Sequence, residues 1–514
     1  MTTVLDQIII NSKKFPNKIA LTDGKNSISY SEFFKDIVAY SETLKSFGLK
    51  KNSVVILSAI KSIDFVVTYF ACQLVGITSV PLAVDVNEQY FKNVVSQTCP
   101  NLIISVIYAK ELEIYRDYKS ISEVKSTLSN STYLTDYYYL HNQALENKAC
   151  VSEIIFTSGT TGIPKGVVLT QENVSASAYN INEFINNTSD DVEIIALPFS
   201  HSFGLGRLRC CLSNAQTVVL VNGFFNLKKF YRLANEFSVS GIAFVPASYA
   251  VLKKLGGDQF FSLSNQLKYI EIGSSSMPRS DKLELLNNFP NTRICMHYGC
   301  TEASRSTFLE FHDIDHLDTI GKNSPNTDVK VFVNTSRTNA LSDYHEANVN
   351  EVGELCVSSM SVTNGYLHSI YSKIQGNNKY YHGNFFRTGD LGYKTNDGYF
   401  VLKGRSNDLI NVGGEKVYPT EVENVILKYP GNIIVDCACV GVEDPDFLLG
   451  NVVKAFVVVD SSVKDIEKEK NQFFENLKQF LSKQLENFKV PRVYEIIDSL
   501  PKTQSGKIKR NLLK

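Results

Sequence analysis

The segment "IIFTSGTTGIPKGVVLT", Ile154 to Thr170, decides the fold and indicates the chemistry of the chain. An apolar strand leads into a loop of glycine, serine and threonine that ends at Lys165. Small residues let backbone N–H groups approach an anion closely, while hydroxyls and a lysine add donors and positive charge. The spacing is not that of the GxxxxGK[ST] loop. The segment therefore predicts a buried strand followed by a phosphate-binding loop of a different type.

Short apolar strands alternate with helix-like stretches through the first four hundred residues. We expect helices at residues 31–47, 226–237 and 280–288. Such alternation predicts an α/β architecture with largely parallel sheets covered by helices. The expected strands lie at residues 53–60, 101–107, 192–198, 216–221, 241–248 and 267–273.

The composition is that of a folded protein without a strong charge bias. Of 514 residues, 43% are hydrophobic and 20% are charged, so we expect two or more domains with large cores. The formal net charge of −1 provides no field to attract nucleic acid or an anionic membrane, and neither is an expected partner. The N-terminal segment lacks the pattern of a signal peptide, which predicts a cytoplasmic protein.

One long uncharged run, residues 65–84, is predicted to be buried and not to span a membrane. It is long enough to cross a bilayer, but it contains Gln73, Gly76, Ser79 and Pro81, which hydrocarbon tolerates poorly. We interpret it as a buried helix that leads into a buried strand.

The cysteines and histidines indicate no metal centre. The ten cysteines include no CxxC pair, and we interpret them as reduced thiols of a cytosolic protein. His312 and His316 have the i, i+4 spacing that can hold zinc. Because Asp313 and Asp315 lie beside them without a third ligand in view, a solvated acidic loop is the favoured interpretation.

A second domain is predicted to begin at residues 406–407. Glycines and small polar residues follow this point, and they are typical of a hinge. Beyond it we expect a helix, a pair of strands, a charged helix at residues 464–487 and a tail. The polar, tyrosine-rich stretch at residues 126–147 is expected to be a surface connection.

Five further segments accompany the loop. They are "LPFSHSFGLG" (197–206), "EIGSSSMP" (271–278), "MHYGCTEAS" (296–304), "FRTGDLG" (386–392) with the following "GR", and "LPKTQSGKIKR" (500–510). Together they resemble the adenylate-forming superfamily, which includes acyl-CoA synthetases, peptide-synthetase adenylation domains and beetle luciferases. The resemblance implies a large N-terminal domain, residues 1–406, of parallel-rich sheets flanked by helices. It also implies a small, mobile α+β domain, residues 407–514.

The resemblance assigns the nucleotide site. Tyr298 would stack on adenine, Asp390 would bind the ribose hydroxyls, and Arg405 would reach the ribose or phosphate side. Thr301 would bind the α-phosphate and Glu302 would hold Mg²⁺, which favours carboxylate and phosphate oxygens. The other expected ATP-binding residues are Thr157, Ser158, Gly159, Thr160, Thr161, Gly162, Lys165, Ser274 and Ser275.

The catalytic lysine implied by the resemblance is Lys507, which the C-terminal domain delivers to the reacting groups. Thr301, Glu302 and His201 complete the expected catalytic set. Lys509 and Arg510 are expected to be surface charges. Asn407 occupies the position where the family commonly has an aspartate or lysine hinge. This difference puts in question the efficiency of the second half-reaction, in which the acyl group is transferred to a thiol. Asparagine nevertheless adopts turn conformations readily.

We expect the acid-binding pocket around His201, with this side chain near the reacting carboxylate. The alternative is that His201 is a histidine packed in the core. Members that activate amino acids usually have an aspartate at the next position, where this chain has Ser202. Because a buried, unpaired ammonium is costly, we expect an acid without an α-amino group. Phe203 would limit the depth of the pocket. By motif position the lining residues are His201, Ser202, Phe203, Gly206, Ser274 and Gly299.

The predicted function is ATP-dependent formation of an acyl-adenylate and transfer of the acyl group to CoA. The nearest alternative is loading of an acyl or amino acid onto the phosphopantetheine of a separate carrier protein. A luciferase-like oxygenase has no independent support in the sequence. A non-catalytic nucleotide sensor would be expected to lack Lys507 or Glu302, and both are present.

Overall fold

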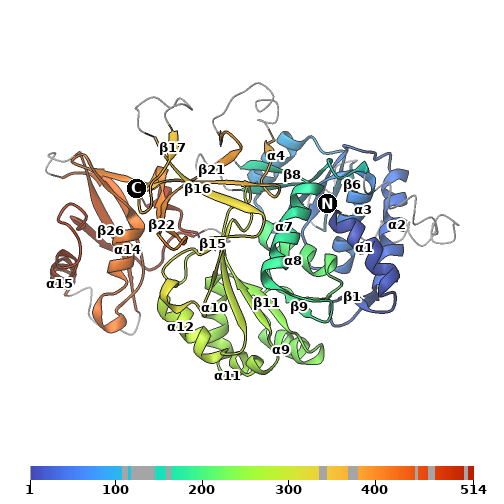
Figure 1. Cartoon of the computed structure of the whole chain (residues 1–514), viewed down its shortest axis with the longest axis horizontal. Helices are drawn as coiled ribbons and strands as arrows, with labels where there is room; N and C mark the ends of the chain where they lie inside the picture. The colour runs from blue at the N-terminus through green and yellow to red at the C-terminus, as the bar shows by residue number, and fades with distance from the viewer. Residues whose placement is uncertain are drawn as a thin grey trace. The chain divides into compact units, whose positions relative to one another are not determined.

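The computed structural model describes residues 2–106, 114–116, 144, 146–157, 164–334, 344–367, 380–445, 450–460, 469–502 and 507–513. The chain forms two compact units (Figure 1). The larger unit comprises Met1–Val329 and Val357–Phe386, and the smaller comprises Lys330–Cys356 and Arg387–Lys514. Helices and strands alternate through the larger unit, which confirms the predicted α/β class.

A sheet of nine strands in the larger unit has the order β15-β14-β13-β12-β11-β9-β10-β1-β2. From β13 to β1 every neighbouring pair is parallel, as predicted. These apolar strands are buried because helices lie on both faces of a parallel sheet. Its strands are β1 (Ile19–Thr22), β2 (Ser27–Ser29), β9 (Val192–Ile195), β10 (Thr217–Leu220), β11 (Gly241–Phe244), β12 (Tyr269–Ile272), β13 (Arg293–Tyr298), β14 (Thr307–Glu310) and β15 (Lys322–Asn323).

The second sheet of the larger unit has seven strands in the order β19-β8-β7-β4-β3-β5-β6. It contains the strand that leads into the glycine-rich loop, paired antiparallel with the strand that follows the loop. Its strands are β3 (Val54–Ser58), β4 (Thr78–Leu82), β5 (Leu102–Ile104), β6 (Tyr115–Arg116), β7 (Val151–Thr157), β8 (Lys165–Thr170) and β19 (Gly365–Tyr366).

The helices of the larger unit cover these sheets, and α1, α7 and α8 pack against one another (Figure 1). Their contacts belong to one large apolar core that also includes α2 and α3. The helices are α1 (Val4–Lys14), α2 (Tyr30–Ser46), α3 (Ile63–Val75), α4 (Glu88–Thr98), α7 (Gln171–Ile185), α8 (Ser202–Ser213), α9 (Leu227–Glu236), α10 (Pro246–Val251), α11 (Asp258–Phe261) and α12 (Arg279–Asn288).

The uncharged run at residues 65–84 is a buried helix, α3, followed by a buried strand, β4, as predicted. The Ser62 side chain caps α3 by accepting a hydrogen bond from the Phe65 N–H at 3.1 Å, and Gly76 ends the helix at a φ of 81°. Glycine adopts this left-handed conformation without strain. Within the described parts of the chain, no helix is both long enough and apolar enough to cross a membrane.

The smaller unit contains a three-stranded sheet, β25-β26-β27, with α14 and α15 packed around the core that it shares with β23 and β24. Strands β16, β18 and β21 begin in one unit and end in the other. The remaining strands and helices are β16 (Thr327–Asn334), β17 (Tyr344–Glu346), β18 (Gly353–Ser359), β20 (Tyr381–His382), β21 (Phe385–Lys394), β22 (Phe400–Arg405), β23 (Ile410–Val412), β24 (Glu415–Val417), α14 (Pro419–Ile426), β25 (Ile434–Glu443), β26 (Asn451–Val459), α15 (Lys470–Ser482) and β27 (Val493–Ile496).

Two expectations about chain segments need correction. The helix predicted at residues 464–487 is described only as α15, Lys470–Ser482; residues 461–468 lie outside the described part of the chain. Most of the stretch at residues 126–147 also lies outside it, but Ala144 and Asn147 at its end are buried. The Asn147 side chain donates to the Leu74 carbonyl at 3.0 Å. This end of the stretch is therefore anchored in the core.

The predicted boundary at residues 406–407 differs from the division by packing, which falls at residues 330, 357 and 387. The division by packing shows which residues share a core, whereas a hinge is the place where the chain rotates. The hinge at residues 406–407 therefore remains a prediction. All ten cysteines are free thiols, and eight of them are buried. His316 pairs with Asp313 at 2.6 Å through its Nδ1 atom.

Candidate active site

The glycine-rich loop is held at both ends by the β7–β8 hairpin. Thr157, the last residue of β7, pairs with Lys165, the first residue of β8, and its hydroxyl donates to the Lys165 carbonyl at 3.4 Å. Antiparallel pairing thus closes the loop at a fixed width. The predicted loop residues Ser158, Gly159, Thr160, Thr161 and Gly162 lie outside the described residues.

A tyrosine links the end of this loop to the predicted metal ligand. The Lys165 ammonium lies 5.7 Å from the centre of the Tyr366 ring, within the range of a cation–π contact. The Tyr366 hydroxyl donates to Glu302 Oε1 at 2.6 Å. Burial raises the pKa of Tyr366, and the Glu302 carboxylate raises it further, so the hydroxyl keeps its proton and remains a donor. Tyr366 is not among the predicted site residues, because its strand β19 lies about two hundred residues beyond the glycine-rich loop.

The backbone around Glu302 is fixed by short-range and distant contacts. The Thr363 N–H donates to the Glu302 carbonyl at 2.8 Å, and Thr301 and Glu302 are both half-buried. Gly299 stands in a tight turn after β13, because a Cβ there would lie 2.6 Å from the Arg305 nitrogen. Any larger residue would displace the turn that presents Thr301 and Glu302.

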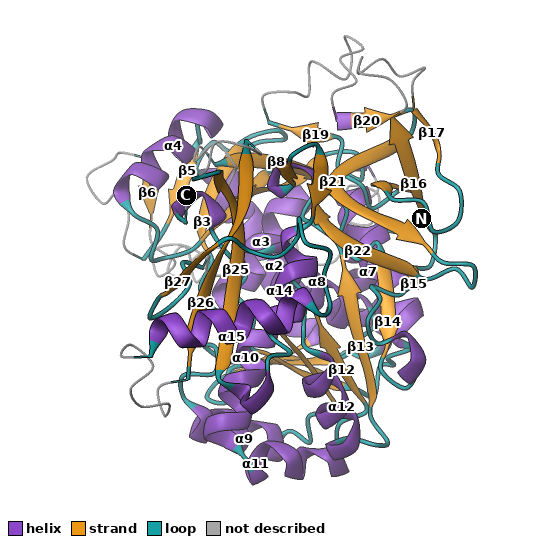
Figure 2. Ribbon diagram, turned by 90° about the vertical axis from the view of Figure 1, so that its left-hand side faces the viewer, coloured by secondary structure: helices purple, strands orange, loops and turns teal. Residues whose placement is uncertain are grey.

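The carboxyl ends of parallel strands meet at one edge of the nine-stranded sheet. Tyr298 is the last residue of β13, and Ser274 and Ser275 follow β12, which lies beside β13 (Figure 2). Ser274 has a φ of 80°, a conformation that favours glycine. The topology therefore brings the β12 and β13 candidates together.

The candidate acid-binding residues follow β9, which ends at the same edge. His201 is the N-cap residue of α8, and its side chain is half-buried. Ser202 begins the helix, and Phe203 is buried against Leu197 and Ala243.

Beneath these residues lies a buried ionic network that motif analysis did not predict. Arg207 donates through Nε to Glu193 at 2.8 Å, with a second bond from Nη2 to the same carboxylate, and through Nη1 to Glu271 at 3.0 Å. Arg305 Nε donates to the other Glu271 oxygen at 3.1 Å. The His297 Nδ1 atom lies 2.7 Å from that same oxygen. One network thus connects α8 with β9, β12 and β13.

Burial and the neighbouring guanidiniums shift the pKa values of Glu271 and His297. Burial alone would raise the pKa of Glu271, but Arg305, Arg207 and His297 outweigh it and hold the pKa well below its usual range. Burial, reinforced by Arg305, lowers the pKa of His297, so His297 is neutral near pH 7. The network therefore has equal numbers of positive and negative charges, and its role is to hold the sheet edge in shape.

In the smaller unit, the structure brings two predicted nucleotide-binding residues together. Asp390 and Arg405 are partners on the antiparallel strands β21 and β22, and Arg405 Nε lies 2.9 Å from Asp390 Oδ1. The Asp390 N–H is held by the Thr388 hydroxyl at 3.0 Å. The carboxylate and the guanidinium thus lie beside one another on one hairpin.

The predicted catalytic lysine, Lys507, is exposed, as is Lys509. The expectation that Arg510 is a surface charge is wrong. Its guanidinium is bound by Glu423, donates to the Cys439 carbonyl at 3.1 Å, and has only 14% of its side chain exposed. The arginine therefore anchors the tail onto α14 and β25 just beyond Lys507.

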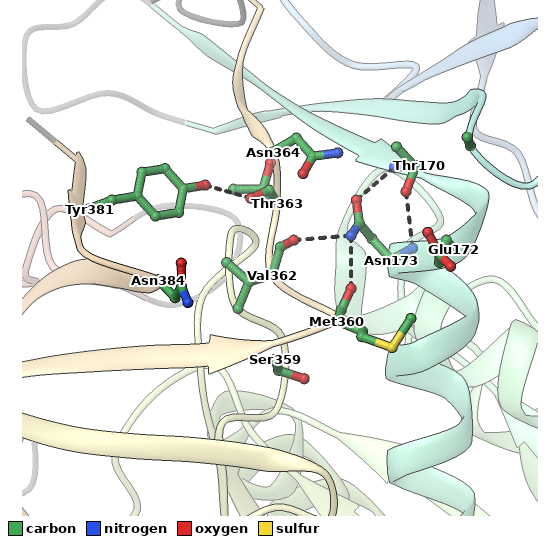
Figure 3. Close-up of a pocket in the computed structure, with 11 residues that line it drawn as sticks. Thr170, Glu172, Asn173, Ser359, Met360, Val362, Thr363, Asn364, Tyr381 and Asn384 are labelled. Carbon is green, nitrogen blue, oxygen red and sulfur yellow. Dashed lines mark hydrogen bonds between the residues drawn. The ribbon is translucent and has the colours of Figure 1, made fainter. Parts of the chain in front are cut away.

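Figure 3 shows a cavity of about 270 Å³ elsewhere in the larger unit. Asn173 closes one side by donating to the carbonyls of Met360 and Val362 at 2.8 and 3.0 Å. None of the predicted site residues is among its described lining residues. One of its lining residues, Thr363, donates its N–H to the Glu302 carbonyl, so the cavity borders the segment that holds Glu302.

Two family models match the chain. The model described as AMP-binding enzyme matches residues 10–367, and the model described as AMP-binding enzyme C-terminal domain matches residues 421–507. The predicted boundary at residues 406–407 lies in the interval between the two matches.

Characterised relatives match nearly the full chain. A 2-succinylbenzoate–CoA ligase of Bacillus licheniformis is 27% identical over 97% of each chain. An oxalate–CoA ligase of Arabidopsis thaliana is 28% identical over 98% of this chain and 96% of its own. Among solved structures, o-succinylbenzoate CoA synthetase from Bacillus subtilis in complex with its acyl-adenylate intermediate has a TM-score of 0.81 at 24% identity, covering 99% of this chain and 98% of that one. The predicted arrangement of a large α/β domain and a small C-terminal domain is thereby confirmed.

Proposed function

Since the chain belongs to the AMP-binding enzyme family, we propose that it is an acid–CoA ligase that activates a carboxylic acid with ATP. The first step joins a carboxylate oxygen to the α-phosphorus of ATP and releases pyrophosphate. The second transfers the acyl group from the adenylate to the thiol of CoA and releases AMP. The observation that carries the proposal is the line of contacts from Lys165 through Tyr366 to Glu302, which joins the phosphate loop to the metal ligand.

Electrostatics accounts for most of the catalysis. Both reactants of the first step are anions, and the transition state gathers further negative charge around phosphorus, so positioning and charge neutralisation lower its barrier. In our proposal Thr157, Lys165 and Thr301 bind phosphate oxygens. Lys507 supplies the cation that meets the developing charge, and its exposure leaves its ammonium accessible to a ligand.

The residues around Glu302 fit a magnesium ion. The carboxylate is an oxygen ligand of the kind that Mg²⁺ prefers, and Tyr366 orients it by hydrogen bonding to one of its oxygens. When bound, the ion would offset the charge of the departing pyrophosphate. In the proposed site Glu302 holds it, and removal of Mg²⁺ with a chelator is expected to stop pyrophosphate release.

Recognition of the nucleoside is assigned to two places. Tyr298 would stack on the adenine beside Ser274 and Ser275, and Asp390 would accept hydrogen bonds from the ribose hydroxyls. An ionised carboxylate accepts hydrogen bonds at both oxygens, so its contact with Arg405 leaves further capacity for a ribose.

The acid is proposed to lack an α-amino group. Ser202 offers no carboxylate to an ammonium, and a buried ammonium without a partner is costly. The relatives support this class, because neither 2-succinylbenzoate nor oxalate, the acids in their names, is an amino acid. His201, at the start of α8, would lie beside the reacting carboxylate.

The acceptor is proposed to be CoA, since the matching relatives are named CoA ligases. Rotation at residues 406–407 would exchange Lys507 for a thiol-binding arrangement between the two steps. A carrier-protein phosphopantetheine is the alternative acceptor. A cytoplasmic location fits the ten free cysteines, because reducing compartments preserve thiols.

The test is mass spectrometry of the products formed from ATP, Mg²⁺, CoA and a mixed pool of fatty, aryl, hydroxy and amino acids. We expect an acyl-CoA, with AMP and pyrophosphate in equal amounts. Formation of acyl-adenylate without thioester would indicate that the acceptor is a carrier protein and not CoA. Failure of every acid to release pyrophosphate, with ATP binding intact, would overturn the assignment as a ligase. The Lys507→Ala variant is the matched negative control.

A further inference from the structure

We propose that Asn173, in the first turn of α7, is a positioning residue for Glu302, an inference that rests on the proposed function. Asn173 lies outside the segments from which the site was predicted. It acts through residues 360–367, here called the strap, which begin 187 positions further along the chain. Three features of the molecule support this role: the hold of the strap on Glu302, the hydrogen bonds from Asn173 to the strap, and the cavity that the strap borders.

The strap holds Glu302 at its backbone and at its side chain. The Thr363 N–H donates to the Glu302 carbonyl at 2.8 Å, and the Tyr366 hydroxyl donates to Glu302 Oε1 at 2.6 Å. Val362 pairs with Ala303, the residue after Glu302, in an antiparallel bridge. The strap thus fixes both the backbone and one carboxylate oxygen of Glu302, so a shift of the strap would shift the proposed magnesium ligand.

Asn173 fastens the strap to the N-terminus of α7 (Figure 3). Its Nδ2 atom donates to the carbonyls of Met360 and Val362 at 2.8 and 3.0 Å. Its Oδ1 atom accepts a hydrogen bond from the Thr170 N–H at 3.0 Å, as part of the capping box of α7. The two ends of this amide therefore have separate tasks, and the side chain is buried. An ionised carboxylate at this position could keep the cap but could not donate to the strap.

The strap borders the cavity of about 270 Å³ shown in Figure 3, so it is not packed closely along that side. The strap residues that line this cavity are Met360, Val362, Thr363 and Asn364. The second half of the strap is fixed by the pairing of β19 with β8. Its first half depends more on hydrogen bonds than on packing, and the Asn173 amide supplies two of them.

Tyr381 anchors the middle of the strap. Its hydroxyl donates to the Thr363 carbonyl at 2.5 Å. Burial, with a further contribution from the Glu302 carboxylate, raises the pKa of Tyr381 to about 12, so the hydroxyl keeps its proton near pH 7 and remains a donor. Loss of the Asn173 bonds would therefore loosen the strap up to Val362 while its remainder stayed in place.

The test uses full-length Asn173→Asp, which can still accept from the Thr170 N–H but can no longer donate to the strap. An acidic residue in the first turn of a helix is favourable, so the variant is expected to fold. One measurement is the Mg²⁺ dependence of pyrophosphate release. The other is the binding of Mn²⁺, which takes the same oxygen ligands, to the complex with α,β-methylene-ATP, followed by electron paramagnetic resonance. This second measurement requires no reaction.

We expect Asn173→Asp to raise both the Mg²⁺ concentration for half-maximal release and the Mn²⁺ concentration for half-saturation at least about fivefold, the scale of one lost hydrogen bond. Asn182→Asp is the matched control, because Asn182 also lies on α7 and its amide also donates to a backbone carbonyl, that of Cys210 at 3.0 Å. It should change neither concentration. Because Asn173 acts through the strap that carries Tyr366, the double variant Asn173→Asp with Tyr366→Phe should show less than the product of the single effects.

Unchanged metal dependence in folded Asn173→Asp would overturn the inference, as would a double variant whose effect equals the product of the single effects. If Asn173→Asp does not fold, Asn173→Ala removes the two donors without adding a charge, and the same outcomes apply to it. Absence of pyrophosphate release from wild type with every acid would instead overturn the proposed function, since Mn²⁺ binding reports on Glu302 separately.

Discussion

The edge of the nine-stranded sheet and the C-terminal tail both carry basic side chains close to predicted site residues, but the surroundings of those side chains are opposite. Arg207 and Arg305 are sealed from water and bound by Glu193 and Glu271. Lys507 lies exposed near the end of the chain. The buried guanidiniums hold strands and a helix together, whereas the exposed Lys507 ammonium is the cation proposed to act on the substrate.

The difference shows that charge type and motif position do not identify a catalytic cation. A buried guanidinium stays charged, so the carboxylates paired with it offset its desolvation, and this pairing makes it structural. An exposed lysine can be reached by a substrate, and in the proposed mechanism Lys507 meets the charge that develops there. Arg510 extends the lesson, because it lies three residues beyond Lys507 and yet behaves like the buried arginines.

The largest effect is expected from Arg207→Met. The substitution leaves the buried Glu193 carboxylate without its ion pair and should lower the free energy of unfolding by about 3–5 kcal/mol, measured by urea denaturation. Arg232→Met is the control, because the Arg232–Glu236 pair is about half exposed and such pairs contribute less than about 1 kcal/mol. Equal decreases in the free energy of unfolding for both variants would show that the buried ion pair contributes no more to stability than the exposed one.

Lys507→Ala tests the exposed cation of the comparison. Loss of the proposed catalytic cation should reduce pyrophosphate release by about 10²–10³-fold, as for removal of one transition-state donor, while the melting temperature and calorimetric ATP binding stay close to wild type. Lys509→Ala changes an equally exposed lysine and should retain most of the activity. Undiminished release by Lys507→Ala would exclude the lysine from the reaction.

Lys61 sharpens the comparison, because it is a half-buried cation without a carboxylate partner among the residues that the structure describes. Its ammonium donates to the Ala196 carbonyl, and burial lowers its pKa to about 7. Above pH 7 the folded protein releases this proton, whereas the unfolded chain retains it up to the ordinary lysine pKa. The unfolded state then binds more protons, so this group's contribution makes the protein more stable as pH rises.

We expect Lys61→Met to remove that contribution. Relative to the variant, wild type should gain about 1–2 kcal/mol between pH 7 and pH 9, measured as the difference between their unfolding free energies at each pH. Lys282→Met, which removes a lysine whose pKa is lowered only to about 8, should show the same trend displaced upward in pH. If the unfolding free energies of wild type and Lys61→Met changed equally with pH, Lys61 would have to stay charged in the folded protein.

The smallest effect is expected from Tyr366→Phe. The variant loses the hydroxyl that orients Glu302 at 2.6 Å, a bond that contributes about 1 kcal/mol. The Mg²⁺ concentration for half-maximal pyrophosphate release should therefore rise about fivefold. Tyr30→Phe is the control, because its hydroxyl donates instead to the Gln216 carbonyl at 2.6 Å and its loss should leave the Mg²⁺ dependence unchanged.

The predicted strands of the nine-stranded sheet, the α3–β4 run and the strand that leads into the glycine-rich loop, β7, are all present, because each is encoded by apolar periodicity over a few neighbouring residues. The motifs placed candidate residues at the carboxyl ends of β9, β12 and β13, where parallel topology brings them to one edge. The strain at Ser274 was not predictable, since a φ of 80° depends on how the chain must turn after β12.

Local sequence thus accounts for the fold class and the order of the two domains, and it supplies the residues that we propose bind nucleotide and acid. It does not reveal which basic residues are structural, because that depends on partners distant in the chain: Arg207 meets Glu271 across 64 positions and Arg510 meets Glu423 across 87. Burial, pairing and the hydrogen bonds from Asn173 to the strap arise only when the chain is folded, since desolvation and contacts between distant segments are properties of neighbours in space.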